Sequence, residues 1–204
     1  MIRVADYIIK FLEKKGISTI FTVSGGGSIF LCDALYKAKK INYVSHHHEQ
    51  AASFAAESYA RTKKKPGCCI VTTGPGGTNS MTGVSSAWID SVPVIFISGQ
   101  VFLNQTIMNT NKRQIGVQEI NIVDLVKPNT KFSKLIDDPN SINYFLEKAF
   151  YIATSGRPGP VWLDIPANIQ NAIINEKLIL KKKFNPVKEK YNLVKLNLLI
   201  KKLN

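Results

Sequence analysis

Two short, almost continuously apolar segments, each followed by a glycine-containing stretch, constrain the fold more than any other feature of the sequence. Residues 68–71 are Cys-Cys-Ile-Val, and residues 94–98 are Val-Ile-Phe-Ile-Ser. Strands that are apolar on both sides are typical of a parallel sheet covered by helices on both faces. These segments therefore predict an α/β fold.

Segments with helical and strand-like patterns alternate along most of the chain. Strands are expected at residues 17–23, 41–45, 68–71, 94–98, 130–135 and 161–165, and helices at residues 4–15, about 28–39, 49–61, 78–90, a short stretch ending near 126, and 141–154. This order predicts an open parallel sheet of about six strands with helices on both faces. We expect one domain over residues 1–170, a linker over 171–190, and the start of a truncated middle domain over 191–204, where Tyr191 opens a last amphipathic helix.

The formal net charge of +13 is concentrated at the C-terminal end of the chain. Residues 177–204 hold nine lysines and one glutamate, which leaves +5 for the first 176 residues. No zinc finger, helix-turn-helix or aromatic-basic surface accompanies this charge, so we expect no nucleic acid partner. No apolar run approaches the ~18–20 residues that span a bilayer, and no secretion signal is recognisable, so a cytoplasmic protein without a membrane partner is expected.

The cysteines and histidines give little sign of a disulfide or a metal site. Cys32, Cys68 and Cys69 are odd in number, and the adjacent pair would alternate between the faces of a strand. Residues 46–48 are three histidines, but no second cluster has ligand spacing, and the middle ring would point away from the other two. We therefore expect reduced thiols and no bound metal.

A single carboxylate, Glu49, stands where a predicted strand passes into an alanine-rich helix. Ligands of open α/β sheets bind at such junctions. Glu49 could simply complement the helix dipole, an effect of about 0.3–1 kcal/mol. Alternatively, its alanine-lined surroundings could disfavour the charged form and let the carboxylate share a proton with a ligand nitrogen.

Two glycine-rich turns follow predicted strands. The turn after residue 71 reads Thr72-Thr73-Gly74-Pro75-Gly76-Gly77-Thr78-Asn79 and has neither Walker nor GxGxxG spacing. Its backbone groups could still hold a polar heterocycle, with Asn79 fixing the turn or capping the next helix. Residues 24–27, Ser-Gly-Gly-Gly, could be a plain turn or could admit a ligand. The long polar segment 99–116 is typical of a functional loop.

Six segments together resemble one family: HEQAA, AAESYAR, TTGPGGTN, FISGQV with GVQE, and GRPGPVWLDIP. They are similar, in the same order, to the N-terminal pyrimidine-binding domain of the thiamine-diphosphate enzymes of the acetolactate synthase group. The similarity runs from about Val4 to about Gln170.

The resemblance implies roles for individual residues. The glutamate that matches Glu49 hydrogen-bonds the ring nitrogen N1′ of the cofactor's aminopyrimidine and promotes its activation. Gly25 and Gln118 would face the reaction centre of a partner subunit, and Arg157 matches a flavin-contacting arginine. The residues implied to line the pyrimidine are Thr73, Gly74, Pro75, Gly76 and Asn79.

The resemblance also implies an activity. Enzymes of this group decarboxylate a 2-oxo acid such as pyruvate and transfer the remaining fragment to an acceptor, in branched-chain amino acid biosynthesis. Val117 and Ala167 stand where the acetolactate synthases often carry phenylalanine and lysine. These departures leave FAD open as a resident cofactor, and leave open a related carboligase with another acceptor, such as a sugar-nucleotide ketone.

The family binds diphosphate and Mg²⁺ through a domain with a Gly-Asp-Gly motif, and that motif does not occur in this sequence. We therefore expect the first domain of a three-domain enzyme, inactive by itself. Its expected partners are further copies of the chain, in a homodimer or a higher oligomer, and a complementing chain that supplies the diphosphate domain. The alternative is a non-catalytic fragment.

Overall fold

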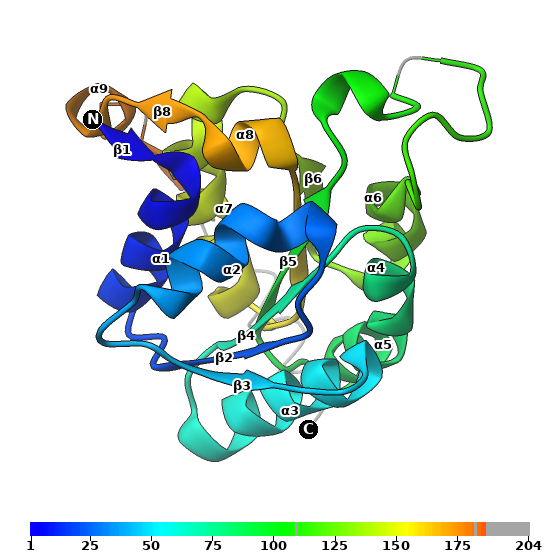
Figure 1. Cartoon of the computed structure of the whole chain (residues 1–204). Coiled ribbons are helices and arrows are strands. Elements are labelled where there is room, and N and C mark those ends of the chain that lie inside the picture. Colours follow the sequence, from blue (N-terminus) through cyan, green and yellow to red (C-terminus); the bar gives the residue numbers. More distant parts are fainter. Residues whose placement is uncertain (109, 182, 187–204) are drawn as a thin grey trace, which may run out of the picture.

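The computed structural model describes residues 1–108, 110–181 and 183–186. Its centre is a six-stranded, all-parallel sheet in the order β3-β2-β4-β5-β7-β6, which confirms the predicted fold class (Figure 1). The strands are β2 (Thr19–Thr22), β3 (Asn42–Ser45), β4 (Gly67–Val71), β5 (Val94–Gln100), β6 (Phe132–Leu135) and β7 (Val161–Pro166).

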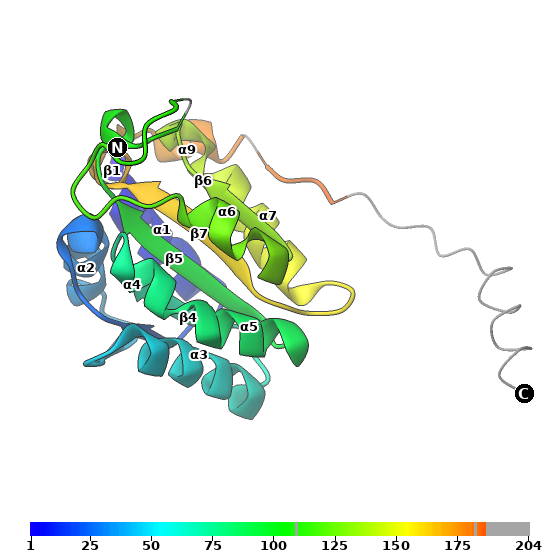
Figure 2. The same cartoon turned by 90° about the vertical axis from the view of Figure 1, so that its right-hand side faces the viewer.

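Helices cover both faces of this sheet (Figure 2). Cys68 and Ile70 pack in one apolar cluster with α1 (Val4–Lys14), α2 (Ile29–Tyr36), α7 (Ile142–Thr154) and α8 (Ala167–Asn171). Cys69 and Val71 pack in a second cluster with α3 (Glu49–Lys63), α5 (Met81–Ile89) and α6 (Ile122–Val126). Adjacent residues of β4 thus belong to opposite layers, as the apolar sequence of this strand predicts. Among the described residues, no helix combines the length and apolar character needed to cross a bilayer.

The helix predicted over residues 78–90 is in fact two helices, and the prediction was wrong about where helical structure begins. A short helix, α4 (Pro75–Asn79), precedes α5, and Ser80 separates them. Proline is favoured at the first helical position because its fixed φ suits the helix and its missing N–H has no partner there. Gly76 and Gly77 lower helix propensity, and they conceal this early start in the sequence.

Four short 3₁₀ helices lie in the described part of the chain: η1 (Gly26–Ser28), η2 (Leu103–Gln105), η3 (Lys127–Asn129) and η4 (Pro139–Ser141). Of these, η2 lies within the segment that the sequence predicts to be a long polar loop.

Regular structure continues past Gln170. The strand β8 (Ile173–Ile174) pairs antiparallel with β1 (Ile2–Arg3), and α9 (Glu176–Ile179) follows it. Ile174 and Ile179 are buried in the same cluster as α1. The pairing of β1 with β8 brings the N-terminus to the segment that follows the sheet. The helix predicted from Tyr191 onward lies outside the described residues.

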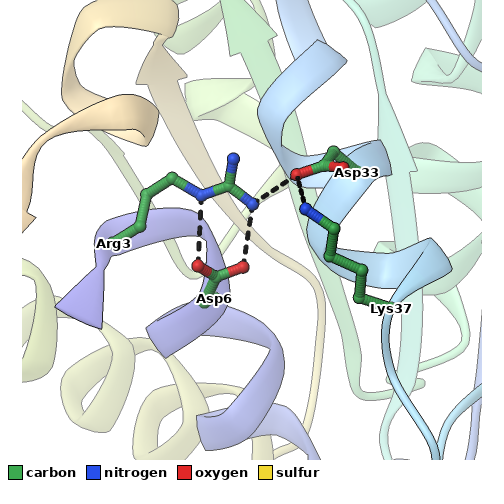
Figure 3. A network of polar contacts seen from close by, with 4 residues as sticks. All are labelled: Arg3, Asp6, Asp33 and Lys37. Carbon is green, nitrogen blue, oxygen red and sulfur yellow. Dashed lines mark hydrogen bonds and ion pairs between the residues drawn. The ribbon is translucent and has the colours of Figure 1, made fainter.

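A polar network on the surface connects α1 with α2 (Figure 3). The guanidinium of Arg3 donates two hydrogen bonds to Asp6, at 3.1 and 2.8 Å, and one to Asp33 at 2.6 Å. Lys37 donates to the same Asp33 oxygen at 2.9 Å. These two cations lower the pKa of Asp33, with Lys37 the larger influence. The bidentate contact fixes Arg3 where β1 passes into α1.

A second polar network is buried between β5 and β7. The hydroxyl of Ser98 donates to Asp164 Oδ1 at 2.6 Å and accepts from Trp162 Nε1 at 2.8 Å. Gln100 Nε2 donates to the other carboxylate oxygen at 3.1 Å. Burial raises the pKa of Asp164 to about 7, although the hydrogen bonds from Ser98 and Gln100 oppose this rise.

The raised pKa of Asp164 predicts a specific pH dependence of stability. In the unfolded chain an aspartate titrates near pH ~3.9, so between about pH 4 and pH 7 the folded state binds more protons than the unfolded state. The free energy of unfolding should therefore fall as pH rises through this range and become level above about pH 7. Relative to Asp164→Asn, the wild-type chain should lose up to about 4 kcal/mol across the range.

Urea unfolding of both proteins at several pH values measures this difference. Asp137→Asn, which changes an exposed carboxylate, serves as the control and should keep the wild-type pH profile. Parallel profiles for wild type and Asp164→Asn would contradict the prediction.

Candidate functional site

The candidate site lies at the carboxyl edge of the sheet, where the strand order reverses. β2 is hydrogen-bonded to β3 on one side and to β4 on the other. After β2 the chain first forms β3 on one side of β2, and it then crosses to form β4 on the other side. Ligands of open α/β sheets bind at such a switch point, between the diverging loops. The turn at residues 24–27 and the loop at residues 72–76 are the two loops at this position.

Glu49 is the first residue of α3, and two neighbours fix its position. His48 caps the helix, because its Nδ1 accepts a hydrogen bond from the backbone N–H of Gln50 at 3.1 Å. Asn79 Nδ2 donates to Glu49 Oε2 at 2.9 Å. The other oxygen, Oε1, accepts no hydrogen bond from the described residues. Glu49 is half-buried, so this oxygen can meet a ligand.

The loop at residues 72–76 requires glycine at two points. Gly74 has φ of +60°, and a Cβ there would lie 2.0 Å from the carbonyl oxygen of Gln118. A Cβ on Gly76 would lie 2.8 Å from Thr72 Cγ2 and 3.5 Å from Glu49 Oε1. The missing side chains let the loop backbone approach both Gln118 and the carboxylate. Between these glycines Pro75 is exposed.

Thr72 connects the two loops of the switch point. Its hydroxyl oxygen accepts a hydrogen bond from the backbone N–H of Gly27 at 3.0 Å. A Cβ on Gly25 would lie 2.5 Å from Thr72 Cβ, so these two residues are in direct contact. The family resemblance implies a role for Gly25 but none for Thr72. The available signal was a β-branched hydroxyl residue at the first position after a buried strand.

Gln118 reaches the site through its backbone, while its side chain is exposed. It has φ of +58°, and its carbonyl faces Gly74. The next residue, Glu119, is buried, and its carboxylate accepts from the backbone N–H groups of Ile107 at 2.6 Å and Ile115 at 3.1 Å. Glu119 thus holds the polar loop that precedes it. No local feature of the sequence distinguishes Glu119 from its neighbour.

Small residues let α3 lie close to the sheet and to α5. A Cβ on Gly67 would lie 2.1 Å from the carbonyl oxygen of Ala56 in α3, and one on Gly83 of α5 would lie 2.3 Å from Ser53 Oγ. Ala52, Ala56 and Ser53 are buried on this side of the helix. The close contacts on both sides leave α3 little freedom to shift, which fixes the position of Glu49 at its start.

Arg157 lies apart from these residues. It precedes β7, so it is at the amino edge of the sheet, whereas Glu49 and the glycine loops are at the carboxyl edge. Its guanidinium donates to Ser91 Oγ at 2.6 Å and to the carbonyl of Ile89 at 3.2 Å. Arg157 therefore borders a separate cavity of about 270 Å³, beside Trp88, Lys131 and Pro158.

The three consecutive histidines have separate surroundings. His46 Nδ1 lies 3.1 Å from the carbonyl oxygen of Val44, and its ring packs against Phe21, whereas His48 caps α3. Within the described part of the chain, no group of three or more His, Cys, Asp or Glu side chains could hold a metal ion. The thiols of Cys68 and Cys69 are fully buried, and burial raises the pKa of both.

Comparisons with known proteins point to one family. The family model described as "Thiamine pyrophosphate enzyme, N-terminal TPP binding domain" matches residues 2–124. The chain is 42% identical over 172 residues to "Acetolactate synthase, chloroplastic" of Arabidopsis thaliana, an alignment that covers 83% of the chain and 24% of that protein. It is 38% identical over 169 residues to "Acetolactate synthase isozyme 1 large subunit" of Escherichia coli (strain K12), covering 83% of the chain and 29% of that protein.

The chain spans about a quarter of the length of these curated relatives. The match covers the sheet up to β5, the glycine loops and Glu49. The resemblance seen in the sequence motifs is therefore confirmed, and the chain belongs to the thiamine pyrophosphate enzyme family, in which it corresponds to the N-terminal TPP-binding domain.

Proposed function

We propose that the switch-point loops hold the aminopyrimidine of thiamine diphosphate, with Glu49 at a ring nitrogen. The observation that carries this proposal is the arrangement of the Glu49 carboxylate. Asn79 holds Oε2, and Oε1 lies open beside Gly76, where the backbone has no side chain to fill the space. A carboxylate held in this way can accept or share a proton at a fixed point.

The residues present fit an aminopyrimidine. Such a ring is flat and carries both hydrogen-bond donors and acceptors, and the loop around Gly74 and Gly76 supplies backbone groups at close range. Thr73, Gly74, Pro75, Gly76 and Asn79 would hold the ring. When bound, thiamine diphosphate supplies the carbanion chemistry on the substrate carbonyl. The protein contributes by orienting the ring and by placing a proton at one nitrogen.

For the longer protein we propose an acetolactate synthase-like carboligase, cytoplasmic, that acts on a 2-oxo acid such as pyruvate. The names of the relatives support this reaction class. Mg²⁺ and the diphosphate would be bound by residues outside this chain. Gly25 and Gln118, which flank the loop at residues 72–76, would face the reaction centre in a homodimer. Arg157 would contact FAD at the opposite edge of the sheet.

The isolated chain should bind thiamine diphosphate weakly, without measurable heat at micromolar concentrations. The pyrimidine contributes contacts here, but most of the cofactor's charge lies in the diphosphate and its Mg²⁺, which need oxygen ligands and cations supplied elsewhere. Calorimetric titration with and without Mg²⁺ tests this. Micromolar binding that depends on Mg²⁺ would show that this chain has a diphosphate site of its own.

Glu49→Gln tests the role of the carboxylate in a complete enzyme, formed with a chain that supplies the diphosphate domain. The glutamine keeps an oxygen to accept from Asn79 but cannot share a proton with the ring. Because general acid–base catalysis contributes about 10²–10⁴-fold, proton exchange at C2 of the bound cofactor should slow by roughly that factor. The unfolding transition should change little.

Glu176→Gln is the matched control, since Glu176 is also the first residue of a helix. It removes a helix-end charge, worth about 0.3–1 kcal/mol, together with the ion pair between Glu176 and Lys10, and it should leave C2 exchange unchanged. Near-normal exchange in the Glu49 variant would reduce Glu49 to such a helix-end charge and remove it from the mechanism.

A further inference from the structure

Gln100, the last residue of β5, uses all the hydrogen-bonding capacity of its side chain. Its Nε2 donates to Asp164 Oδ2 at 3.1 Å and to the carbonyl of Ile120 at 3.0 Å. Its Oε1 accepts from the backbone N–H of Val101 at 3.0 Å and from the Thr73 hydroxyl. The residue is only 1% exposed. A buried amide with two donors and two acceptor positions all paired is held in one orientation.

Two of these partners belong to two segments of the candidate site. Thr73 lies in the loop that contains Gly74 and Gly76, and Ile120 lies two residues after Gln118, whose carbonyl faces Gly74. The side chain of Gln100 thus joins the two segments by hydrogen bonds, and the backbone of Gln118 contacts Gly74 directly. With both contacts made, neither segment can shift relative to the other without breaking a buried hydrogen bond.

Two backbone groups determine which way the Gln100 amide points. The carbonyl of Ile120 can accept only from the amide NH₂, and the backbone N–H of Val101 can donate only to the amide oxygen. The NH₂ group therefore also faces Asp164, and the amide oxygen faces Thr73. The proton of the Thr73 hydroxyl is then committed to Gln100, and the Thr73 oxygen can offer a ligand only its lone pairs.

We propose that Gln100 is a positioning residue of the cofactor site. It fixes the loop at residues 72–76 against the segment at residues 118–120, and it makes Thr73 a hydrogen-bond acceptor toward an N–H group of the heterocycle. This inference rests on the proposed function, since it assumes that the heterocycle binds beside Thr73 and Glu49.

The first test uses the free chain and needs no ligand. Gln100→Glu keeps the size of the side chain and one acceptor oxygen, but places a second oxygen against Asp164 and the Ile120 carbonyl. Hydrogen–deuterium exchange at pH 8 should show at least a tenfold loss of protection at residues 73–80 and 118–121. The core of β4 should stay protected.

Ser98→Ala is the matched control. It removes a buried hydroxyl from the same carboxylate but leaves the four hydrogen bonds of Gln100 in place. This variant should be less stable while both segments keep their protection. Unchanged protection in Gln100→Glu, or an equal loss in Ser98→Ala, would overturn the proposal.

The second test asks whether the Thr73 oxygen contributes to ligand binding, with thiamine itself as the probe at millimolar concentration, by NMR titration. Thr73→Val keeps the shape of the side chain but has no oxygen, so it should weaken thiamine binding about tenfold, whereas Thr73→Ser should restore it. If Thr73→Val bound thiamine as the wild type does, the assignment of Thr73 as an acceptor would be wrong.

The two proposals fail in different ways. If Glu49→Gln bound thiamine with the same affinity as the wild type, the proposed function would be contradicted. The exchange experiment would still decide whether Gln100 joins the two segments. Lost protection in Gln100→Glu with unchanged thiamine affinity would show a purely structural role and overturn the positioning role.

Discussion

The arrangement of the site depends on the burial of β4 and β5 between two apolar layers. Cys68 and Ile70 face the layer formed with α1, and Cys69 and Val71 face the layer formed with α3. A polar side chain in the middle of such a strand would need a buried partner, and each unpaired group costs roughly 1–3 kcal/mol. Polar groups that can serve a ligand are therefore confined to the strand ends, where the loops meet.

The buried polar residues near these ends follow the same constraint. Ser98, Gln100 and Asp164 lie toward the ends of β5 and β7, and each is hydrogen-bonded to another member of the group. The network places polar side chains in the buried part of the sheet next to the site, and each of them has a hydrogen-bond partner. Its position explains how residues that never face solvent can still fix the loops above them.

Local sequence patterns were sufficient to predict the six-stranded sheet, but they did not predict β1, β8 or the start of α4. The apolar runs at β4 and β5 identify buried strands without any knowledge of their neighbours. The two-residue strands β1 and β8 are too short to carry a period, and they pair residues such as Ile2 and Ile174 that are far apart in the sequence. The start of α4 was hidden because proline and glycine have opposite effects on helix propensity at that point.

The candidate site was predictable to a similar degree. Glu49 and the glycine loop could be found from their motifs, because a junction and a turn are local features. The hydrogen bond from Asn79 to Glu49 and the one from Gln100 to Asp164 join residues 30 and 64 positions apart, and no local pattern predicts such pairs. Arg157 lies at the opposite edge because it precedes β7. This edge can be assigned only when the directions of the neighbouring strands are known.

The exposure of β3 has a consequence for how the site opens. All four of its residues are exposed, and it is the outermost strand on its side of the sheet, whereas β4 and β5 are wholly buried. Proteins open first where little apolar surface is buried, so β3 should separate from β2 at a lower free energy than the core unfolds. Because β3 ends four residues before Glu49, such a local opening would free the segment that connects β3 to α3, while α3 itself stays packed against β4 and α5.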